Sequence, residues 1–134
     1  METTLGRRAD ELIELAFQTL SDVRVLRHEV SIERWRVDLT GSFGDYTIHI
    51  SEISAMDWHK YAYYVLKEIS IVVGFDNSPD VYAIEMKYPE EPQAQRHEKI
   101  PHRHGANKSE LELTDEMTFE RFIEWLKTNL NPDA

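Results

Sequence analysis

Two histidines in the last third of the chain have a spacing that could support chemistry. His102 and His104 are separated by one residue in the segment Pro101-His102-Arg103-His104. In an extended strand, residues two positions apart point to the same side, with their backbones about 6.5–7 Å apart. Imidazoles titrate near neutral pH, so one ring could accept a proton from a nucleophile while the other donates a proton to a leaving group on a bound phosphate. We therefore predict that His102 and His104 form a catalytic acid–base pair.

The same two histidines could instead bind a metal ion. Nitrogen atoms of both rings could converge on one ion, and the carboxylate of Asp76 could complete the set of ligands. Asp76 also has a place in the acid–base mechanism, where we expect it to orient one histidine. The leading prediction is the acid–base mechanism, which requires no metal and no other cofactor. An exposed loop without function is the simplest alternative, because a His-x-His spacing also arises by chance.

The histidines lie in a basic segment of an acidic chain. The formal net charge of the protein is −10. The segment Arg96–Lys108 contains four basic residues and one acidic residue, so its charge is +3 and the rest of the chain carries −13. If the protein binds a polyanion, this segment is where it should bind, with Arg103 and Lys108 holding phosphate. In an extended segment Arg103 points away from both histidines, and a solvated basic loop is the alternative for the whole segment.

Two further residues are candidates for substrate binding. Asn77 follows Asp76 at the end of an apolar strand, where a rigid backbone can present a polar group. Turns also use Asp and Asn to bond their own backbone, so capping of the turn is the alternative. Tyr63 lies in the aromatic-rich stretch Trp58–Tyr64 and could stack on a base, although aromatic residues of strands more often pack in a core.

The elements that must position these residues belong to a globular fold. Hydrophobic residues make up 41% of the chain and charged residues 30%, and there is no cysteine, as is common in the reducing cytoplasm. No apolar run reaches the roughly 20 residues of a membrane-spanning helix. We therefore predict one cytoplasmic domain over residues 1–134 that does not contact a membrane.

Two amphipathic helices are predicted, one near each end of the chain. Apolar residues recur every three or four positions in Arg7–Leu20 and in Phe119–Asn129. Thr118 precedes the second helix and is its predicted N-cap. Both helices should bury their apolar stripes against one face of a sheet.

Between the helices the sequence predicts an antiparallel sheet of five to six strands. Alternating or continuous apolar residues indicate strands at Asp22–Ser31, Arg34–Thr40, Tyr46–Ile53, Tyr61–Leu66 and Ile69–Phe75, with a sixth candidate at Val81–Tyr88. Gly41–Asp45 and Asp76–Pro79 are expected to be turns, and Ser54–Lys60 a connection. The run Ile69–Val73 should be a central strand that is buried on both faces. The predicted fold is thus an α+β meander packed with an N-terminal and a C-terminal helix.

Several short motifs together resemble the TumE family of prokaryotic toxin–antitoxin proteins. The motifs are Tyr61-Ala62-Tyr63-Tyr64, Gly74-Phe75-Asp76-Asn77-Ser78-Pro79, Ile100-Pro101-His102-Arg103-His104-Gly105 and the helix introduced by Thr118. The family shows a Tyr-x-Tyr strand, an aromatic-Asp-Asn-Ala-Pro turn and a Phe-Pro-His-His-Lys-His segment. The similarity runs from about Leu20 to the C-terminus. Here Asp80-Val81-Tyr82 stands where the family often has histidines, and one histidine of the cluster is either replaced by Arg103 or displaced.

The resemblance implies a small toxin that is encoded beside a helix-turn-helix antitoxin. Together with the basic histidine segment, it leads to the hypothesis of a toxin that acts on RNA as a metal-independent ribonuclease. The catalytic residues would be His102, His104 and Asp76, and the substrate-binding residues would be Arg103, Lys108, Asn77 and Tyr63. The alternative is a non-catalytic module whose acidic surface docks a basic or helix-turn-helix partner, with Pro101–His104 in the interface. A third hypothesis is a metal-dependent enzyme that uses the same three catalytic residues as ligands.

Overall fold

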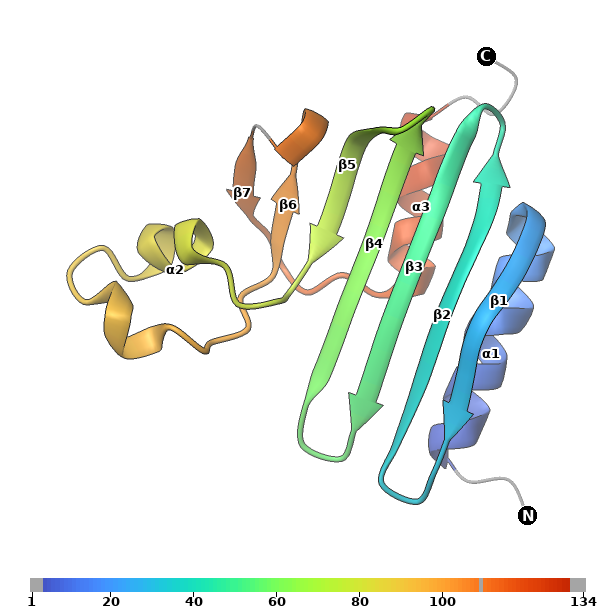
Figure 1. Cartoon of the computed structure of the whole chain (residues 1–134), viewed down its shortest axis with the longest axis horizontal. Helices are drawn as coiled ribbons and strands as arrows, with labels where there is room; N and C mark the ends of the chain where they lie inside the picture. The colour runs from blue at the N-terminus through green and yellow to red at the C-terminus, as the bar shows by residue number, and fades with distance from the viewer. Residues whose placement is uncertain (1–3, 109, 131–134) are drawn as a thin grey trace.

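The computed structural model describes residues 4–108 and 110–130, which form an α+β fold (Figure 1). The elements in chain order are α1 (Thr4–Thr19), β1 (Ser21–Val30), β2 (Arg34–Phe43), β3 (Tyr46–Ala55), β4 (His59–Lys67), β5 (Ser70–Asp76), α2 (Val81–Lys87), β6 (His102–His104), β7 (Leu111–Leu113) and α3 (Phe119–Asn129). Short 3₁₀ turns cover Pro92–Gln95 and Ala106–Lys108. The strands of these residues form one seven-stranded antiparallel sheet in chain order, which confirms the predicted meander and its two flanking helices.

The two long helices cover the same face of the sheet. Helix α1 packs on β1 and β2, and α3 packs on β4 and β5 (Figure 1). Because successive residues of a strand point to opposite faces, β2 buries Trp35 and Val37 under the helices and turns Arg36 and Asp38 the other way. In the described part of the chain no helix lies over this second face of β1–β4. We call it the open face.

The strands of the long hairpins are longer, and the turns between them shorter, than the sequence predicted. Strand β2 continues through Gly41 to Phe43, so the expected five-residue turn is reduced to Gly44 and Asp45. Gly44 has a φ of 61°, in the left-handed region that glycine adopts without strain. Likewise, β3 and β4 extend into the connection predicted at Ser54–Lys60. Pairing with a neighbouring strand therefore outweighs the local turn preference at both sites.

The prediction that Ile69–Val73 is buried on both faces is wrong. Strand β5 begins at Ser70, and Ile69 is 93% exposed in the turn before it. Only the second half of β5 is well buried, where Phe75 packs against α3. A continuous apolar run does not by itself show which residues are covered, since the helix that buries them lies elsewhere in the chain.

The candidate strand Val81–Tyr88 is in fact helix α2. Asp80 caps this helix, because its carboxylate accepts hydrogen bonds from the backbone N–H groups of Tyr82 and Ala83 at 2.9 and 3.0 Å. Ala83 is buried in a small apolar cluster with Ile100. A run this short has apolar positions compatible with either period, and the cap decides the outcome. Neither α2 nor any other helix within the described residues is long and apolar enough to cross a membrane.

Strands β6 and β7 extend the sheet beyond β5, although each has only three residues. They were not among the predicted strands, but the extended backbone expected around the histidines is confirmed, because His102–His104 is β6 itself. The register pairs Gly74 with His104 and Asp76 with His102. This pairing positions the residues that could do chemistry.

Candidate functional site

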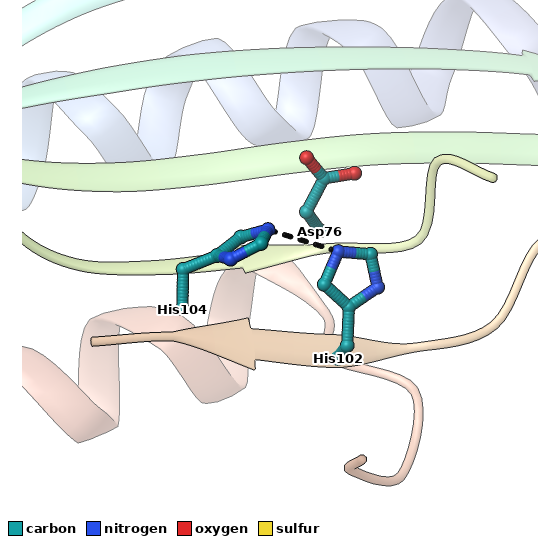
Figure 2. Close-up of side chains that lie close together, drawn as sticks. All are labelled: Asp76, His102 and His104. Atoms are coloured by element: carbon teal, nitrogen blue, oxygen red, sulfur yellow. Dashed lines mark hydrogen bonds between the residues drawn. The ribbon is translucent and has the colours of Figure 1, made fainter. Parts of the chain in front are cut away.

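Strand pairing brings Asp76, His102 and His104 together on one face of the sheet. Directly paired residues share a face, and so do residues two apart on one strand. Figure 2 shows both imidazoles on the same side of β6, with the Asp76 carboxylate beside them. One ligand atom from each residue lies within 4.8 Å of the others. We call these three residues the His–His–Asp site.

The two imidazole rings are in contact and almost fully buried. His102 is 1% exposed and His104 is 6% exposed. Nδ1 of His102 lies 2.7 Å from the carbonyl oxygen of Ile100, which can only accept, so Nδ1 is the donor and Nε2 carries a lone pair in the neutral ring. That Nε2 lies 3.1 Å from Nε2 of His104. In the neutral pair, Nε2–H of His104 therefore donates a hydrogen bond to Nε2 of His102.

Negatively charged groups surround the imidazole pair. Burial lowers the pKa of His104 and the neighbouring His102 lowers it further, so the ring is neutral near pH 7 and can bind a metal. Oδ2 of Asp80 lies 4.0 Å from Nε2 of His104. Asp80 thus acts twice, as the cap of α2 through Oδ1 and as a second carboxylate near the site.

Asp76 is held by its own turn and by Tyr64. Its Oδ1 accepts a hydrogen bond from the backbone N–H of Ser78 at 2.6 Å, and its Oδ2 accepts one from the hydroxyl of Tyr64 at 3.1 Å. Burial raises the pKa of Tyr64, which keeps this hydroxyl protonated as a donor. The expected turn-capping role is therefore present. Each carboxylate oxygen still has a second lone pair for another partner.

Gly74 makes room for the Tyr64 ring. Gly74 pairs with Tyr64 on one side and with His104 on the other. A Cβ atom at position 74 would lie 2.1 Å from Cε1 of Tyr64, so any other residue would displace the ring. The Tyr64 ring in turn stacks on His104, with ring centroids 6.4 Å apart. A glycine inside a strand marks this close approach in the sequence.

The two cations predicted to hold phosphate lie in different places. Arg103 lies between the histidines on β6 and points to the other face, as expected, where its Nη1 is 3.8 Å from Oε2 of Glu112. Lys108 lies on the face of the site, with Nζ 5.3 Å from the centroid of the Tyr64 ring. The structure therefore brings Lys108, but not Arg103, to the His–His–Asp site.

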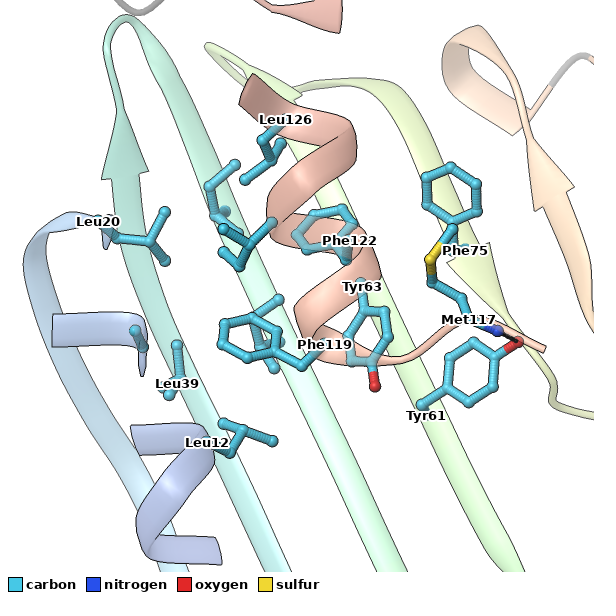
Figure 3. Close-up of a cluster of buried hydrophobic side chains, with 14 of the residues drawn as sticks. Leu12, Leu20, Leu39, Tyr61, Tyr63, Phe75, Met117, Phe119, Phe122 and Leu126 are labelled. Carbon is cyan, nitrogen blue, oxygen red and sulfur yellow. Dashed lines mark hydrogen bonds between the residues drawn. The ribbon is translucent and has the colours of Figure 1, made fainter. Parts of the chain in front are cut away.

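The other two predicted substrate-binding residues are not brought to this site. The Asn77 amide accepts a hydrogen bond from the backbone N–H of Tyr61 and donates one to the carbonyl of His59, both at 2.9 Å. It fastens the start of β4 to the turn after β5. Tyr63 is fully buried on the helix-covered face, stacked on Tyr61 with ring centroids 5.0 Å apart (Figure 3).

Replacing Asn77 with alanine should lower the free energy of unfolding by about 1–3 kcal/mol, because the buried N–H of Tyr61 loses its acceptor. Asn129→Ala is the matched control, since that amide makes only an exposed hydrogen bond to the carbonyl of Trp125. We expect the control to change stability by less than about 0.5 kcal/mol. Urea denaturation measures both variants, and equal losses of stability would contradict the structural role of Asn77.

A second polar cluster, centred on Glu52, was not predicted from the sequence. Glu52 is 1% exposed on the helix-covered face of β3 and accepts a hydrogen bond from the Tyr63 hydroxyl. Nε2 of His59 lies 3.4 Å from Oε2 of Glu52, and this interaction raises the pKa of His59. A groove of about 510 Å³ opens beside the two residues. The signal in the sequence is an acidic residue in phase with the core residues Ile48 and Ile50.

Comparison with known proteins does not indicate a function for this chain, so the function must be argued from the geometry of the site. Protein-family models, curated proteins and solved structures give no significant match to this chain. The resemblance to the TumE family therefore stays a prediction from the motifs. The geometry of the His–His–Asp site is the firmer basis for a function.

Proposed function

We propose that the His–His–Asp site binds a divalent metal ion and that the protein is a metal-dependent nuclease, the toxin component of a toxin–antitoxin pair. The observation that carries the proposal is the 3.1 Å separation of the Nε2 atoms of His102 and His104. Two nitrogens that bind one ion at about 2.0–2.1 Å lie about 2.8–3.4 Å apart at octahedral to tetrahedral angles. The imidazole pair has the spacing of two ligands of one ion.

The surroundings of the pair support a metal as well. The bond from Nδ1 of His102 to the carbonyl of Ile100 orients the ring and leaves Nε2 to coordinate, as second partners of metal-binding histidines do. Asp76 supplies a carboxylate that is itself oriented by two hydrogen bonds. Two imidazoles and one carboxylate suit zinc, iron or manganese and leave positions for water and substrate, as catalytic sites require.

The short separation argues against the metal-independent acid–base pair. A phosphate between two imidazoles needs a hydrogen bond of about 2.8 Å to each ring, which places the nitrogens more than about 5 Å apart. The rings of His102 and His104 instead touch each other and are buried. Binding a metal through both Nε2 atoms requires only that the proton on Nε2 of His104 move to Nδ1 of the same ring, a buried atom with no hydrogen-bond partner among the described residues.

The chemistry that follows is phosphodiester hydrolysis. A bound divalent ion lowers the pKa of a coordinated water and polarises a phosphoryl oxygen. Lys108, beside the site, would hold the anionic substrate there. Asp80, 4.0 Å from His104, is the nearest carboxylate beyond the three ligands and would accept the proton of the attacking water. The choice of a nucleic acid as substrate rests on the motif resemblance and on the Lys108 ammonium beside the site.

Metal-dependent cleavage tests this proposal. Protein treated with EDTA should leave labelled single-stranded RNA intact, and added Mn²⁺ or Zn²⁺ should restore cleavage. Asp76→Asn should lower the rate about 100-fold or more at limiting metal, because it removes the charged ligand. Asp57→Asn, in the exposed turn between β3 and β4, is the control and should retain full activity. Cleavage that is insensitive to EDTA would favour the metal-independent mechanism instead.

We also propose a helix-turn-helix antitoxin as the partner, as the motif resemblance implies. The charge of −13 outside Arg96–Lys108 would attract a basic protein. Co-expression with the neighbouring gene, followed by gel filtration, should give a stable complex in which RNA cleavage is suppressed. A complex whose isolated member never cleaves RNA, with any metal, would support the non-catalytic binding module.

A further inference from the structure

The open face of β1–β4 carries positive charge in an acidic protein, and we propose that it binds a single-stranded nucleic acid. This inference rests on the proposed nuclease function, since the bound strand would be the substrate of the His–His–Asp site. The substrate would lie along the open face, and this face includes none of the residues of the basic segment Arg96–Lys108.

The register of the sheet directs five basic and two acidic side chains to the open face. The basic residues are Arg24, Arg27, Arg34, Arg36 and Lys60, and the acidic residues are Glu29 and Asp38. The basic and acidic residues of β2 and β4 alternate with residues that the helices cover, so their side chains point to the open face. Those of β1 are paired with open-face residues of β2 and therefore share that face. The strands thus give this face a charge of +3, whereas the whole chain carries −10.

Only part of this positive charge is neutralised within the protein. Oδ2 of Asp38 lies 3.0 Å from Nε of Arg36 and 3.8 Å from Nε of Arg27, so two arginines share one carboxylate. Glu29 pairs with Arg27 at 3.2 Å. Within residues 4–108 and 110–130, no ion pair involves the other three cations, Arg24, Arg34 and Lys60. These three side chains are available to contact phosphates.

A shallow hollow on the open face extends to Tyr64, which contacts the His–His–Asp site. The hollow has a volume of about 340 Å³ and is lined by apolar and polar residues, among them Leu26, Thr40 and Ser51, with Tyr64 on its β4 side. Tyr64 donates its hydroxyl hydrogen bond to Asp76 and lies under Nζ of Lys108. A strand that follows the hollow would therefore reach the site at Tyr64.

The dimensions of the face favour a single strand over a duplex. Four strands spaced about 4.8 Å apart span about 14 Å between the outer strands, which is wider than the roughly 12 Å of a major groove. A four-stranded face is long enough to contact two or three unpaired bases, as sheets that bind RNA do. Polar side chains on this face can bond base edges while the cations hold the backbone.

The test removes two cations from the open face and leaves the metal ligands unchanged. The variant Arg34→Ser with Lys60→Ser loses two positive charges there, and the matched control Arg7→Ser with Lys127→Ser loses the same charge from exposed positions of α1 and α3. Fluorescence anisotropy with a labelled RNA of about 12 nucleotides, in EDTA to prevent cleavage, measures binding. At low salt the open-face variant should bind at least about tenfold more weakly, and the slope of log K against log salt should decrease by about 1.4. The control should bind like the unmodified protein.

Four outcomes would overturn the inference. The first three are unchanged binding by the open-face variant, equal weakening by the control, and a duplex of the same length that binds as tightly as the single strand. Absence of binding by single-stranded RNA and DNA at low salt would also overturn it and would leave the face to a protein partner. Failure of the proposed nuclease would be distinguishable from failure of this inference. A protein that binds RNA through the open face and binds Mn²⁺, but cleaves no RNA, would support the binding surface and contradict the nuclease activity.

Discussion

Titration of the His102→Ala protein with Zn²⁺ should show a loss of affinity of about 100-fold or more relative to the unmodified chain. Removing one imidazole leaves His104 and Asp76 as a two-ligand site, and even changes in groups that only orient metal ligands cost about 10–100-fold. Isothermal titration calorimetry measures this loss directly. Because activity is not the readout, the result does not depend on the identity of the substrate.

Controls separate loss of a ligand from loss of the fold. His102 is buried, so His102→Gln, which keeps most of the side-chain volume, should also lose Zn²⁺ binding while unfolding cooperatively. His49→Ala is the matched histidine control, since His49 lies exposed on the open face away from β6. Unchanged Zn²⁺ affinity in both His102 variants would rule out the metal site.

Replacing Phe122 with alanine should destabilise the protein by about 3–5 kcal/mol, which is the largest effect on stability that we expect. Phe122 is 0% exposed on α3 and lies among the rings of Tyr63, Phe75 and Phe119 (Figure 3). The alanine would leave a cavity between α3 and the sheet that the surrounding side chains cannot fill. Chemical denaturation followed by circular dichroism measures the change.

The same substitution at an exposed phenylalanine is the control. Phe17 is 59% exposed on α1, so Phe17→Ala should change the free energy of unfolding by less than about 1 kcal/mol. A loss below about 1 kcal/mol for Phe122→Ala would contradict the packing of α3 on β4 and β5. The folded fraction of the Phe122 variant should still bind Zn²⁺, because the His–His–Asp site lies on the other face of the sheet.

The helices at both ends and the long hairpins were predictable because their signals are local. The 3.6-residue period of Phe119–Asn129 and the two-residue period of Arg34–Thr40 each reflect one element that buries one side. The misassigned segment Val81–Tyr88 shows the limit of such signals. Its helix depends on the Asp80 cap and on contact with Ile100, and periodicity over so few residues cannot distinguish it from a strand.

The charge of the open face could not be located from the sequence. The basic residues that form it are dispersed between Arg24 and Lys60, among six acidic residues of which only Glu29 and Asp38 are directed to the same face by the strand register. Counting charges along the chain therefore favoured Arg96–Lys108, where four cations lie close together in the sequence. Within that segment Arg103 points to the opposite face from the histidines.

For the His–His–Asp site itself, the sequence determined that His102 and His104 share one side of the backbone, because a period of two is a property of any extended chain. Only the tertiary structure decided that their Nε2 atoms meet at 3.1 Å with Asp76 beside them. That meeting depends on the pairing of β5 with β6, which joins residues far apart in the chain. Glycine at position 74 leaves room for the Tyr64 ring, so that Tyr64 can reach Asp76. Spacing along a chain carries no information about such contacts, since they are set by the register of neighbouring strands.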